Sequence, residues 1–229
     1  MQSRMQQNIL EALRLGPFAV LDETSRQQLA EHTHLRPFNK GEFLYREGQE
    51  GTNAALLLAG LVQLTRSAAR GRECMLHLVR PGHLLDAGVL FYEGGLPTSA
   101  VGLTGGQILW LEKPSLLAAL HQQPELGLGI MATFALRQRL FIHKLAGSQG
   151  RISASRRVAA WLLHRSKMEK SDSLDLGVSR EVLARLMGLS RESLSRELSR
   201  LASQQLVHVE RRRVTLLQKD ALQRLADSV

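Results

Sequence analysis

The chain has one cysteine, Cys74, among its 229 residues. A single thiol cannot form a disulfide within the chain, and it cannot complete a cysteine cage for zinc or for an iron–sulfur cluster. We therefore expect neither cystines nor an iron–sulfur cluster. Cys74 also lies in an apolar run without an evident basic cluster, so a redox switch at this thiol is a weak hypothesis.

Long apolar runs and catalytic motifs are missing as well. No stretch of about 18 consecutive apolar residues occurs, so we expect no membrane-spanning helix. Residues 1–16 lack the apolar core of a signal peptide and have the pattern of an amphipathic helix. No nucleophile–base pair, metal cluster or phosphate-binding loop can be assembled from the residues. These absences predict a cytoplasmic protein that has no membrane partner and is not an enzyme.

Positive charge is plentiful and unevenly placed. The net charge is +9, and residues 1–145 contribute only +2 of it, from 14 Lys and Arg against 12 Asp and Glu. Residues 146–229 contribute +7, from 16 basic against 9 acidic residues. A basic C-terminal third indicates an anionic partner, for which nucleic acid is the leading candidate and anionic lipid a weaker one.

Residues 5–33 have a helical pattern, in which Asp22 is placed to cap a second short helix. From residue 34 to 111 the chain changes to strand-length apolar runs separated by glycines, such as Phe43–Tyr45 and Ala54–Leu58. Many short strands with regular turns predict an antiparallel β-barrel of the jelly-roll (double-stranded β-helix) kind. With the helices on either side, the fold class is α+β.

Pro124 is placed to begin a long helix that extends to about residue 145. One side of it has a heptad pattern, formed by Leu128, Met131, Ala135, Gln138, Ile142 and Leu145. A second apolar side is formed by Leu126, Ile130, Thr133, Phe134, Leu140 and Phe141. Two apolar sides indicate two packing partners, the barrel and a second subunit. The alternative is a helix buried on all sides within one domain.

Small residues at 146–150 predict a joint between domains. Beyond it we expect a helix around Trp161, a polar linker over Lys167–Ser173, and then a helix-turn-helix over Val178–Ser203. Two short strands, 206–209 and 213–217, follow with a turn at 210–212, and a final helix begins near Asp220. This order is typical of a winged helix-turn-helix.

Within the helix-turn-helix, Gly188 supplies the positive φ that a sharp turn requires, and Ser190 is placed to N-cap the second helix. The apolar side of this second helix carries Leu194, Leu198 and Leu201. Its opposite side presents Arg191, Glu192, Ser195 and Arg196. The alternative interpretation is an ordinary solvated helix with ion pairs such as Glu192–Arg196.

The whole chain resembles the cyclic-AMP receptor protein / fumarate–nitrate regulator (Crp/Fnr) family of bacterial transcription regulators. The resemblance rests on FNKGEFLYREGQE, LAGLVQLTRS and GRECMLHLVRPGHLL in the barrel, and on SRRVAAWLL and VSREVLARLMGLSRESLSRELSRL after it. It implies a sensor barrel at residues 1–123, a dimerisation helix and hinge at 124–150, and a winged helix-turn-helix at 151–229. An effector in the barrel would shift the packing of the dimer helices and so reorient the two DNA-binding domains.

The resemblance also implies a homodimer that binds a palindromic operator in double-stranded DNA and acts with RNA polymerase. It assigns base reading to Arg191, Glu192, Ser195 and Arg196, and their chemistry suits guanine and cytosine edges. Because this set is similar to the readers of both main branches of the family, we expect half-sites close to TTGTGA. The phosphate-contact candidates are Ser179, Arg180, Ser190, Arg211, Arg212 and Arg213.

Cyclic-nucleotide members of the family hold the ribose with a Gly-Glu pair and the phosphate with an Arg-Ser or Arg-Thr pair. The corresponding pocket residues here are Asp86, Ala87, Thr98 and Ser99. Ala87 stands where glutamate is expected and Thr98 where arginine is expected. A buried phosphate would lose charge-assisted contacts of about 1.5–3 kcal/mol each. The resemblance therefore implies an effector other than cyclic AMP.

The segment DAGVLFYEGGLPTSAVGL is similar to that of family members that respond to nitric oxide or nitrogen oxides, some of which bind haem. A haem needs an axial ligand, and His77 and His83 are the first candidates because they flank the central strands. An organic effector and the absence of any ligand remain open. The alternative function is a ligand-binding regulatory module that acts on a protein partner and not on DNA.

Overall fold

The computed structural model describes residues 2–67, 73–91, 93–148 and 153–227. The chain divides into two compact units, Met1–Gln138 and Arg139–Val229, and each unit has its own core. Across the described helices, none is long and apolar enough to cross a membrane.

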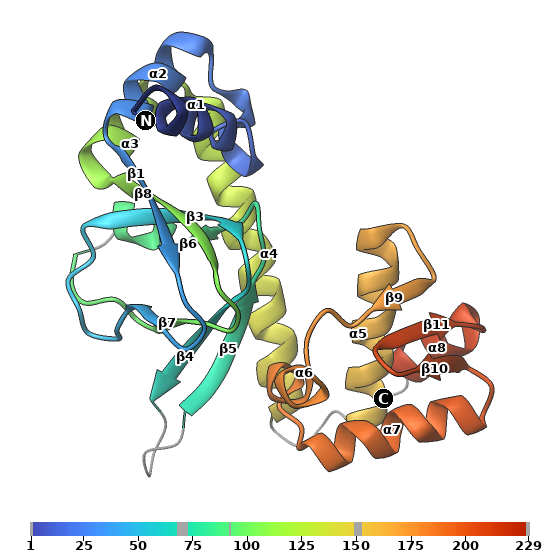
Figure 1. The fold of residues 1–229 in the computed structure, drawn as a ribbon. Coiled ribbons are helices and arrows are strands. Elements are labelled where there is room, and N and C mark those ends of the chain that lie inside the picture. The colour runs from blue at the N-terminus through green and yellow to red at the C-terminus, as the bar shows by residue number, and fades with distance from the viewer. Residues whose placement is uncertain (1, 68–72, 92, 149–152, 228–229) are drawn as a thin grey trace. The chain divides into compact units, whose positions relative to one another are not determined.

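The N-terminal unit is built on two four-stranded antiparallel sheets (Figure 1). One sheet has the strand order β1-β8-β3-β6 and the other the order β2-β7-β4-β5. The strands are β1 (Thr33–Phe38), β2 (Phe43–Tyr45), β3 (Asn53–Ala59), β4 (Val62–Ser67), β5 (Glu73–Val79), β6 (Leu84–Leu85), β7 (Ser99–Gly102) and β8 (Gly106–Glu112). The predicted α+β fold with an antiparallel sheet domain is confirmed.

The first sheet is apolar on both faces at its centre. Leu56 on β3 pairs with Leu109 on β8, Leu57 pairs with Ile108, and all four side chains are fully buried. Successive residues of a strand point to opposite faces, so both faces must be covered. The second sheet lies on one side, and the helices α1 (Gln2–Ala12) and α3 (Lys113–Gln122) contact β1 and β8.

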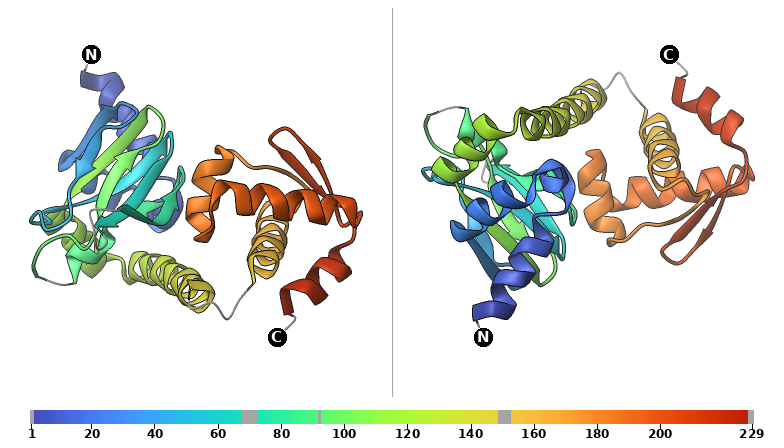
Figure 2. Two further views of the ribbon diagram at one scale, coloured as in Figure 1. Left: turned by 90° about the horizontal axis from the view of Figure 1, so that it is seen from below. Right: turned by 90° about the horizontal axis from the view of Figure 1, so that it is seen from above.

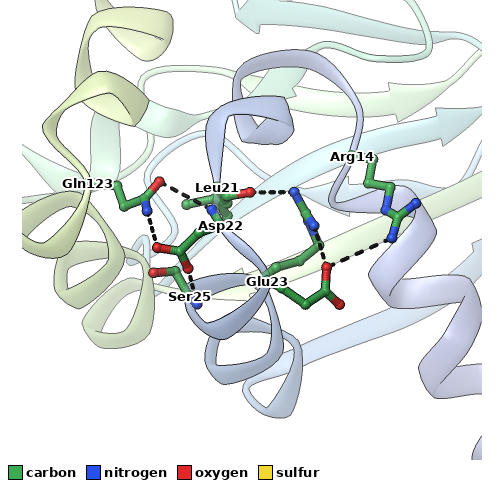
Figure 3. A network of polar contacts seen from close by, with 7 residues as sticks. Arg14, Leu21, Asp22, Glu23, Ser25 and Gln123 are labelled. Atoms are coloured by element: carbon green, nitrogen blue, oxygen red, sulfur yellow. Dashed lines mark hydrogen bonds and ion pairs between the residues drawn. The ribbon is translucent and has the colours of Figure 1, made fainter.

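The helix α2 (Glu23–Glu31) begins at the predicted cap. The Asp22 carboxylate accepts a hydrogen bond from the Ser25 amide at 2.7 Å, and the Gln123 side-chain amide donates to the same carboxylate (Figure 3). These contacts lower the pKa of Asp22, with the bond from the Ser25 amide as the largest cause. Because Gln123 lies between α3 and α4, its contacts with Asp22 connect the start of α2 to that junction. A 3₁₀ helix, η1 (Gly16–Val20), precedes α2.

The long helix α4 (Pro124–Ser148) begins at the predicted proline. Leu126 and Ile130 are fully buried against the barrel, whereas Leu128 is 62% exposed, Met131 54% and Ile142 58%. The interpretation of a helix buried on all sides is therefore wrong, because the heptad side faces solvent in the single chain. The helix continues through Ser148, so the first three residues of the predicted joint at 146–150 are helical; residues 149–150 lie outside the described residues.

In the described part of the C-terminal unit, the helices α5 to α8 pack with a three-stranded sheet of order β10-β11-β9. Its elements are α5 (Ala154–Glu169), β9 (Ser173–Asp175), α6 (Arg180–Met187), α7 (Arg191–Ser203), β10 (Val207–Glu210), β11 (Arg213–Leu216) and α8 (Lys219–Asp227). Helix α7 contacts both α5 and β10, and Figure 2 shows the β10–β11 hairpin folded back beside α7.

The predicted linker at Lys167–Ser173 is wrong in part. Helix α5 includes its first three residues, and Ser173 begins strand β9. The Asp172 carboxylate accepts a hydrogen bond from the Ser166 hydroxyl at 2.9 Å and pairs with Lys219, while Leu174 is fully buried. The polar composition of this segment did not indicate strand β9, which forms because it pairs with β11.

Candidate nucleic-acid interface and effector pocket

The turn between α6 and α7 is sharp because Gly188 takes a left-handed conformation, with φ 66°. This φ is costly for any residue with a Cβ atom. The Arg157 guanidinium on α5 donates to the carbonyls of Met187 and Gly188, each at 3.1 Å. Helix α5 therefore stabilises the turn through Arg157, and the turn sets the direction of α7.

Helix α7 is capped and packed as its sequence predicts. The Ser190 hydroxyl accepts from the Ser193 amide at 3.1 Å and so satisfies one of the free N–H groups of the first turn. Leu194, Leu198 and Leu201 are at most 2% exposed and anchor the inner side of the helix. On the same unit, Glu197 accepts from Ser155 at 2.6 Å and pairs with Arg200 at 3.0 Å.

The outer side of α7 carries the four predicted base readers. Arg191, Glu192 and Arg196 are exposed, and Ser195 is half-buried. Arg196 directs Nη2 to the Ser193 hydroxyl at 3.4 Å. The pKa of Glu192 is lowered by a hydrogen bond from its own backbone amide, then by the Ser190 hydroxyl and by Arg191. Glu192 is therefore an ionised acceptor at the N-terminal end of an exposed helix.

The predicted phosphate contacts surround this helix. Ser179 caps α6 by accepting from the Val182 amide at 3.3 Å, which leaves its O–H able to donate. Arg180 Nη2 lies 3.5 Å from the carbonyl of Arg211 in the β10–β11 turn. The side chains of Arg211, Arg212 and Arg213 are exposed and, with Asp175 and Glu210, line a hollow at the hairpin.

The second candidate site is a buried polar cluster in the barrel that contains two of the predicted pocket residues. Asp86, in a left-handed conformation with φ 47° and ψ 33°, precedes the 3₁₀ helix η3 (Ala87–Leu90). Tyr45 on β2 and Thr98 just before β7 are 5% and 8% exposed. The Tyr45 hydroxyl, Asp86 Oδ2 and Thr98 Oγ1 are buried close to one another, and the Tyr45 hydroxyl interacts with both Asp86 and Thr98.

Arg137 on α4 joins this cluster and donates from Nη2 to the carbonyl of Leu84. Burial lowers the pKa of Arg137, and the nearby Tyr45 and Asp86 oppose that change. Burial also raises the pKa of Asp86, although Tyr45 and Arg137 favour its carboxylate form. The pKa of Tyr45 is raised well above its ordinary value, mainly by burial and next by Asp86. The cluster therefore contains opposite charges whose desolvation is only partly compensated.

The other two predicted pocket residues offer little to a cyclic phosphate. Ala87 is fully buried and has no polar side-chain atom. The Ser99 hydroxyl accepts from the Glu47 amide at 2.9 Å and so holds the preceding loop. At these four positions the barrel therefore presents no guanidinium, and its one ionisable side chain is the carboxyl group of Asp86.

The histidines proposed for haem lie in different settings. His77 is half-buried on β5, opposite Leu64 on β4. His83 is exposed before β6, with Nδ1 3.2 Å from the carbonyl of Pro81. Within the described residues, no group of three or more histidine, cysteine or acidic side chains is placed to hold a metal ion.

Tyr45, Arg137 and Arg157 were not found by reasoning from the sequence. For Arg137 a signal existed: positions 130, 134, 137 and 141 follow a 4-3-4 helical spacing, and an arginine interrupts this otherwise apolar stripe. Tyr45 looked like an ordinary strand residue, and Arg157 like a charge on a basic helix.

A basic β-hairpin beside a capped, exposed helix, in a unit separate from a two-sheet barrel, defines a winged helix-turn-helix protein with an N-terminal sensor domain. The comparisons with known proteins agree. The profile of the Crp-like helix-turn-helix domain matches residues 156–225, and that of the cyclic nucleotide-binding domain matches residues 35–123.

The chain is 30% identical over 194 residues to the cyclic AMP receptor protein of Thermus thermophilus, covering 81% of this chain and 87% of that one. It is 23% identical over 220 residues to a CRP-like cAMP-activated global transcriptional regulator of Mycobacterium tuberculosis, covering 93% and 97%. The structure of FixK2 from Bradyrhizobium japonicum is similar in fold, with a TM-score of 0.72, 21% identity and coverage of 86% and 98%. The chain belongs to the Crp/Fnr family of DNA-binding transcription regulators.

Proposed function

We propose that two copies of this chain read a palindrome with half-sites close to TTGTGA through Arg191, Glu192, Ser195 and Arg196. The observation that carries the proposal is the exposure of Arg191, Glu192 and Arg196, with the half-buried Ser195 beside them, on the first turn and a half of α7. A helix presented in this way enters the major groove by its N-terminal end. The proposal concerns the sequence that is read, beyond membership of the family.

The chemistry of the four residues suits G·C-containing half-sites. Arginine donates two hydrogen bonds to guanine O6 and N7, and glutamate accepts from cytosine N4. The lowered pKa of Glu192 keeps its carboxylate in the accepting form near neutral pH. Ser179, Arg180, Ser190 and Arg211–Arg213 would contact phosphates and set the register of the helix without reading bases.

The exposed heptad side of α4 supports a homodimer. Leu128, Met131 and Ile142 present exposed apolar side chains along this side, interrupted by Gln138, and a second α4 would cover them in a coiled coil. A dimer places two α7 helices about one turn of DNA apart, which a palindrome requires. Bound to its operator, the dimer would act through RNA polymerase in the cytoplasm.

For the effector we propose a molecule other than cyclic AMP. Ala87 and Thr98 provide neither the acid nor the guanidinium that a cyclic nucleotide would use. A haem-mediated response to nitric oxide, with His77 or His83 as axial ligand, is a candidate that rests on the sequence resemblance. The absorbance spectrum of the protein mixed with haem tests this candidate. An unshifted Soret band in the wild type rules out haem ligation. A Soret band that is shifted equally in the wild type and in a His77→Ala/His83→Ala variant rules out these two histidines as ligands.

The DNA proposal is tested by selecting operators from a random duplex library with the purified chain, followed by footprinting. We expect two-fold symmetric protection over TTGTGA-like half-sites, whereas selected sites without symmetric G·C pairs contradict the proposal. A salt titration separates it from action on a protein partner. Several phosphate contacts make log K fall by about 0.9 per contact for each unit of log salt, and a flat response would favour the protein partner.

A further inference from the structure

A carboxylate on the flank of α7, that of Glu197, connects this helix to α5. Its Oε2 accepts a hydrogen bond from the Ser155 hydroxyl at 2.6 Å and another from Arg200 Nε at 3.0 Å. The Glu197 side chain is 16% exposed. Burial disfavours its charged form, but the hydrogen bonds from Ser155 and Arg200 outweigh this effect, so the pKa of Glu197 is lowered. Glu197 is therefore an ionised acceptor at the contact between two helices.

Glu197 lies on α7 between the buried leucines and the candidate base readers. Successive residues of a helix are rotated by about 100°, so Glu197 is about 100° from Arg196 on one side and from Leu198 on the other. The buried leucines hold α7 in place through apolar contacts, which are not directional. A hydrogen bond has a preferred direction, and the bond from Ser155 joins α7 to a different element. This bond therefore opposes rotation of α7 about its own axis.

We propose that the hydrogen bond between Ser155 and Glu197 is a positioning contact that sets the rotation of α7 and with it the base reading by Arg196. The inference deepens the proposed reading of TTGTGA-like half-sites and rests on it. Ser155 and Glu197 act through Arg196, and neither is assigned a contact with DNA.

A small rotation of α7 displaces the readers by a distance that matters. With its side chains a helix is about 10–12 Å across, so an atom at its surface moves about 1 Å when the helix rotates by about 10°. A recognition site needs its groups within about 0.5 Å of the productive geometry. The phosphate-contact candidates on α6 and in the β10–β11 turn lie outside α7 and do not move with it. Loss of the bond should therefore reduce discrimination between sequences more than affinity for DNA in general.

The test is fluorescence anisotropy of the full chain on the selected operator, on duplexes with one substituted half-site position, and on a random duplex. Ser155→Ala removes the hydroxyl and leaves the Glu197 carboxylate, which also attracts Arg196. We expect it to reduce discrimination at the position read by Arg196 about fivefold or more, with little change on the random duplex or in the salt slope. Ser155→Thr retains a hydroxyl and should restore discrimination, whereas Glu197→Ala should reduce it at least as much as Ser155→Ala.

The Arg196→Ala background separates positioning from a general effect on stability. In that background Ser155→Ala should cause no further loss of discrimination at the same position, because the reader through which the bond acts is absent. Ser203→Ala is the matched control, since Ser203 is an exposed serine of α7 whose hydroxyl donates within the helix, to the Arg200 carbonyl. Alanine favours a helix, so Ser155→Ala remains informative if Glu197→Ala does not fold.

The proposal is overturned if Ser155→Ala discriminates as well as the wild type, if it weakens binding to all duplexes equally, or if its full effect adds to that of Arg196→Ala. Each of these outcomes leaves base reading by Arg196 intact. Unchanged discrimination in Arg196→Ala alone would instead contradict the proposed function on which the inference rests.

Discussion

At the scale of the residue, the two sets of DNA-contact candidates are distinguished by what their removal does. A base reader contributes to discrimination between sequences, whereas a phosphate contact contributes to affinity for every sequence. Arg196 on α7 represents the first set, and Arg212 in the β10–β11 turn represents the second. Both are exposed, so neither substitution should disturb the fold.

Arg196→Ala should therefore cost about 1–3 kcal/mol in discrimination at one half-site position, measured by anisotropy on matched and mismatched duplexes. Arg212→Ala should weaken binding to all duplexes alike and reduce the salt slope by about 1 per protomer. The control is Arg224→Ala, an exposed arginine of α8. Equal effects of Arg196→Ala on matched and mismatched DNA would remove Arg196 from the reading set.

Asp86→Asn provides a second prediction at this scale. Burial raises the pKa of Asp86 in the folded chain, so the folded state retains a proton that the unfolded chain has already released. The stability of the wild type must then fall as pH rises from the ordinary Asp pKa of 3.8 through the raised value. The amide carries no such cost, so the variant should be more stable than wild type at neutral pH, with a difference that disappears in acid.

Urea unfolding between pH 4 and 8, followed by the fluorescence of Trp110 on β8, measures this difference. An Asp86→Asn variant that is less stable than wild type at pH 7 would show that the pairing with Arg137 outweighs desolvation.

At the scale of the element, the helix-turn-helix depends on one backbone conformation. Gly188 has φ 66°, and an added Cβ would lie 3.5 Å from Arg157 Nη1, which is an ordinary contact. The cost of Gly188→Ala is therefore conformational and should be about 1–2 kcal/mol in the free energy of unfolding. Trp161 on α5 reports unfolding of this unit.

Gly127→Ala is the comparison, because Gly127 lies in α4 and an added Cβ would meet only the Leu120 side chain at 3.5 Å. It should leave the Trp161 transition unchanged. If Gly188→Ala also left the Trp161 unfolding transition unchanged, the left-handed conformation of Gly188 would not limit the stability of the C-terminal unit.

At the scale of the whole molecule, we expect function to depend on the exposed side of α4, the proposed dimer seam. Met131→Asp should place a charge in the proposed seam and convert the dimer to a monomer in sedimentation velocity. Affinity for the palindrome should fall by about a hundredfold or more, because each half-site would be bound independently. Met168→Asp on α5 is the matched control, since both methionines are exposed, at 54% and 61%. A Met131→Asp protein that stays dimeric would contradict the seam.

The sequence alone determined the elements whose signals are local. Pro124, Ser190, Gly188 and Asp22 mark helix boundaries because capping and backbone conformation act over three or four residues. The periodic leucines of α7 predicted which side is buried, and the four candidate base readers followed as the residues of the opposite side. The resemblance to a known family rested on such phrases in the expected order.

Only the tertiary structure decided the features that depend on distant parts of the chain. Strand β9 exists because it pairs with β11, some forty residues away, and its polar sequence gave no sign of that pairing. The sequence left open whether α4 is buried on all sides or on one side only, and the exposure of Leu128, Met131 and Ile142 beside the full burial of Leu126 and Ile130 decides between the two. The cluster of Tyr45, Asp86, Thr98 and Arg137 likewise spans more than ninety residues, because desolvation and charge pairing depend on distance in space and not along the chain.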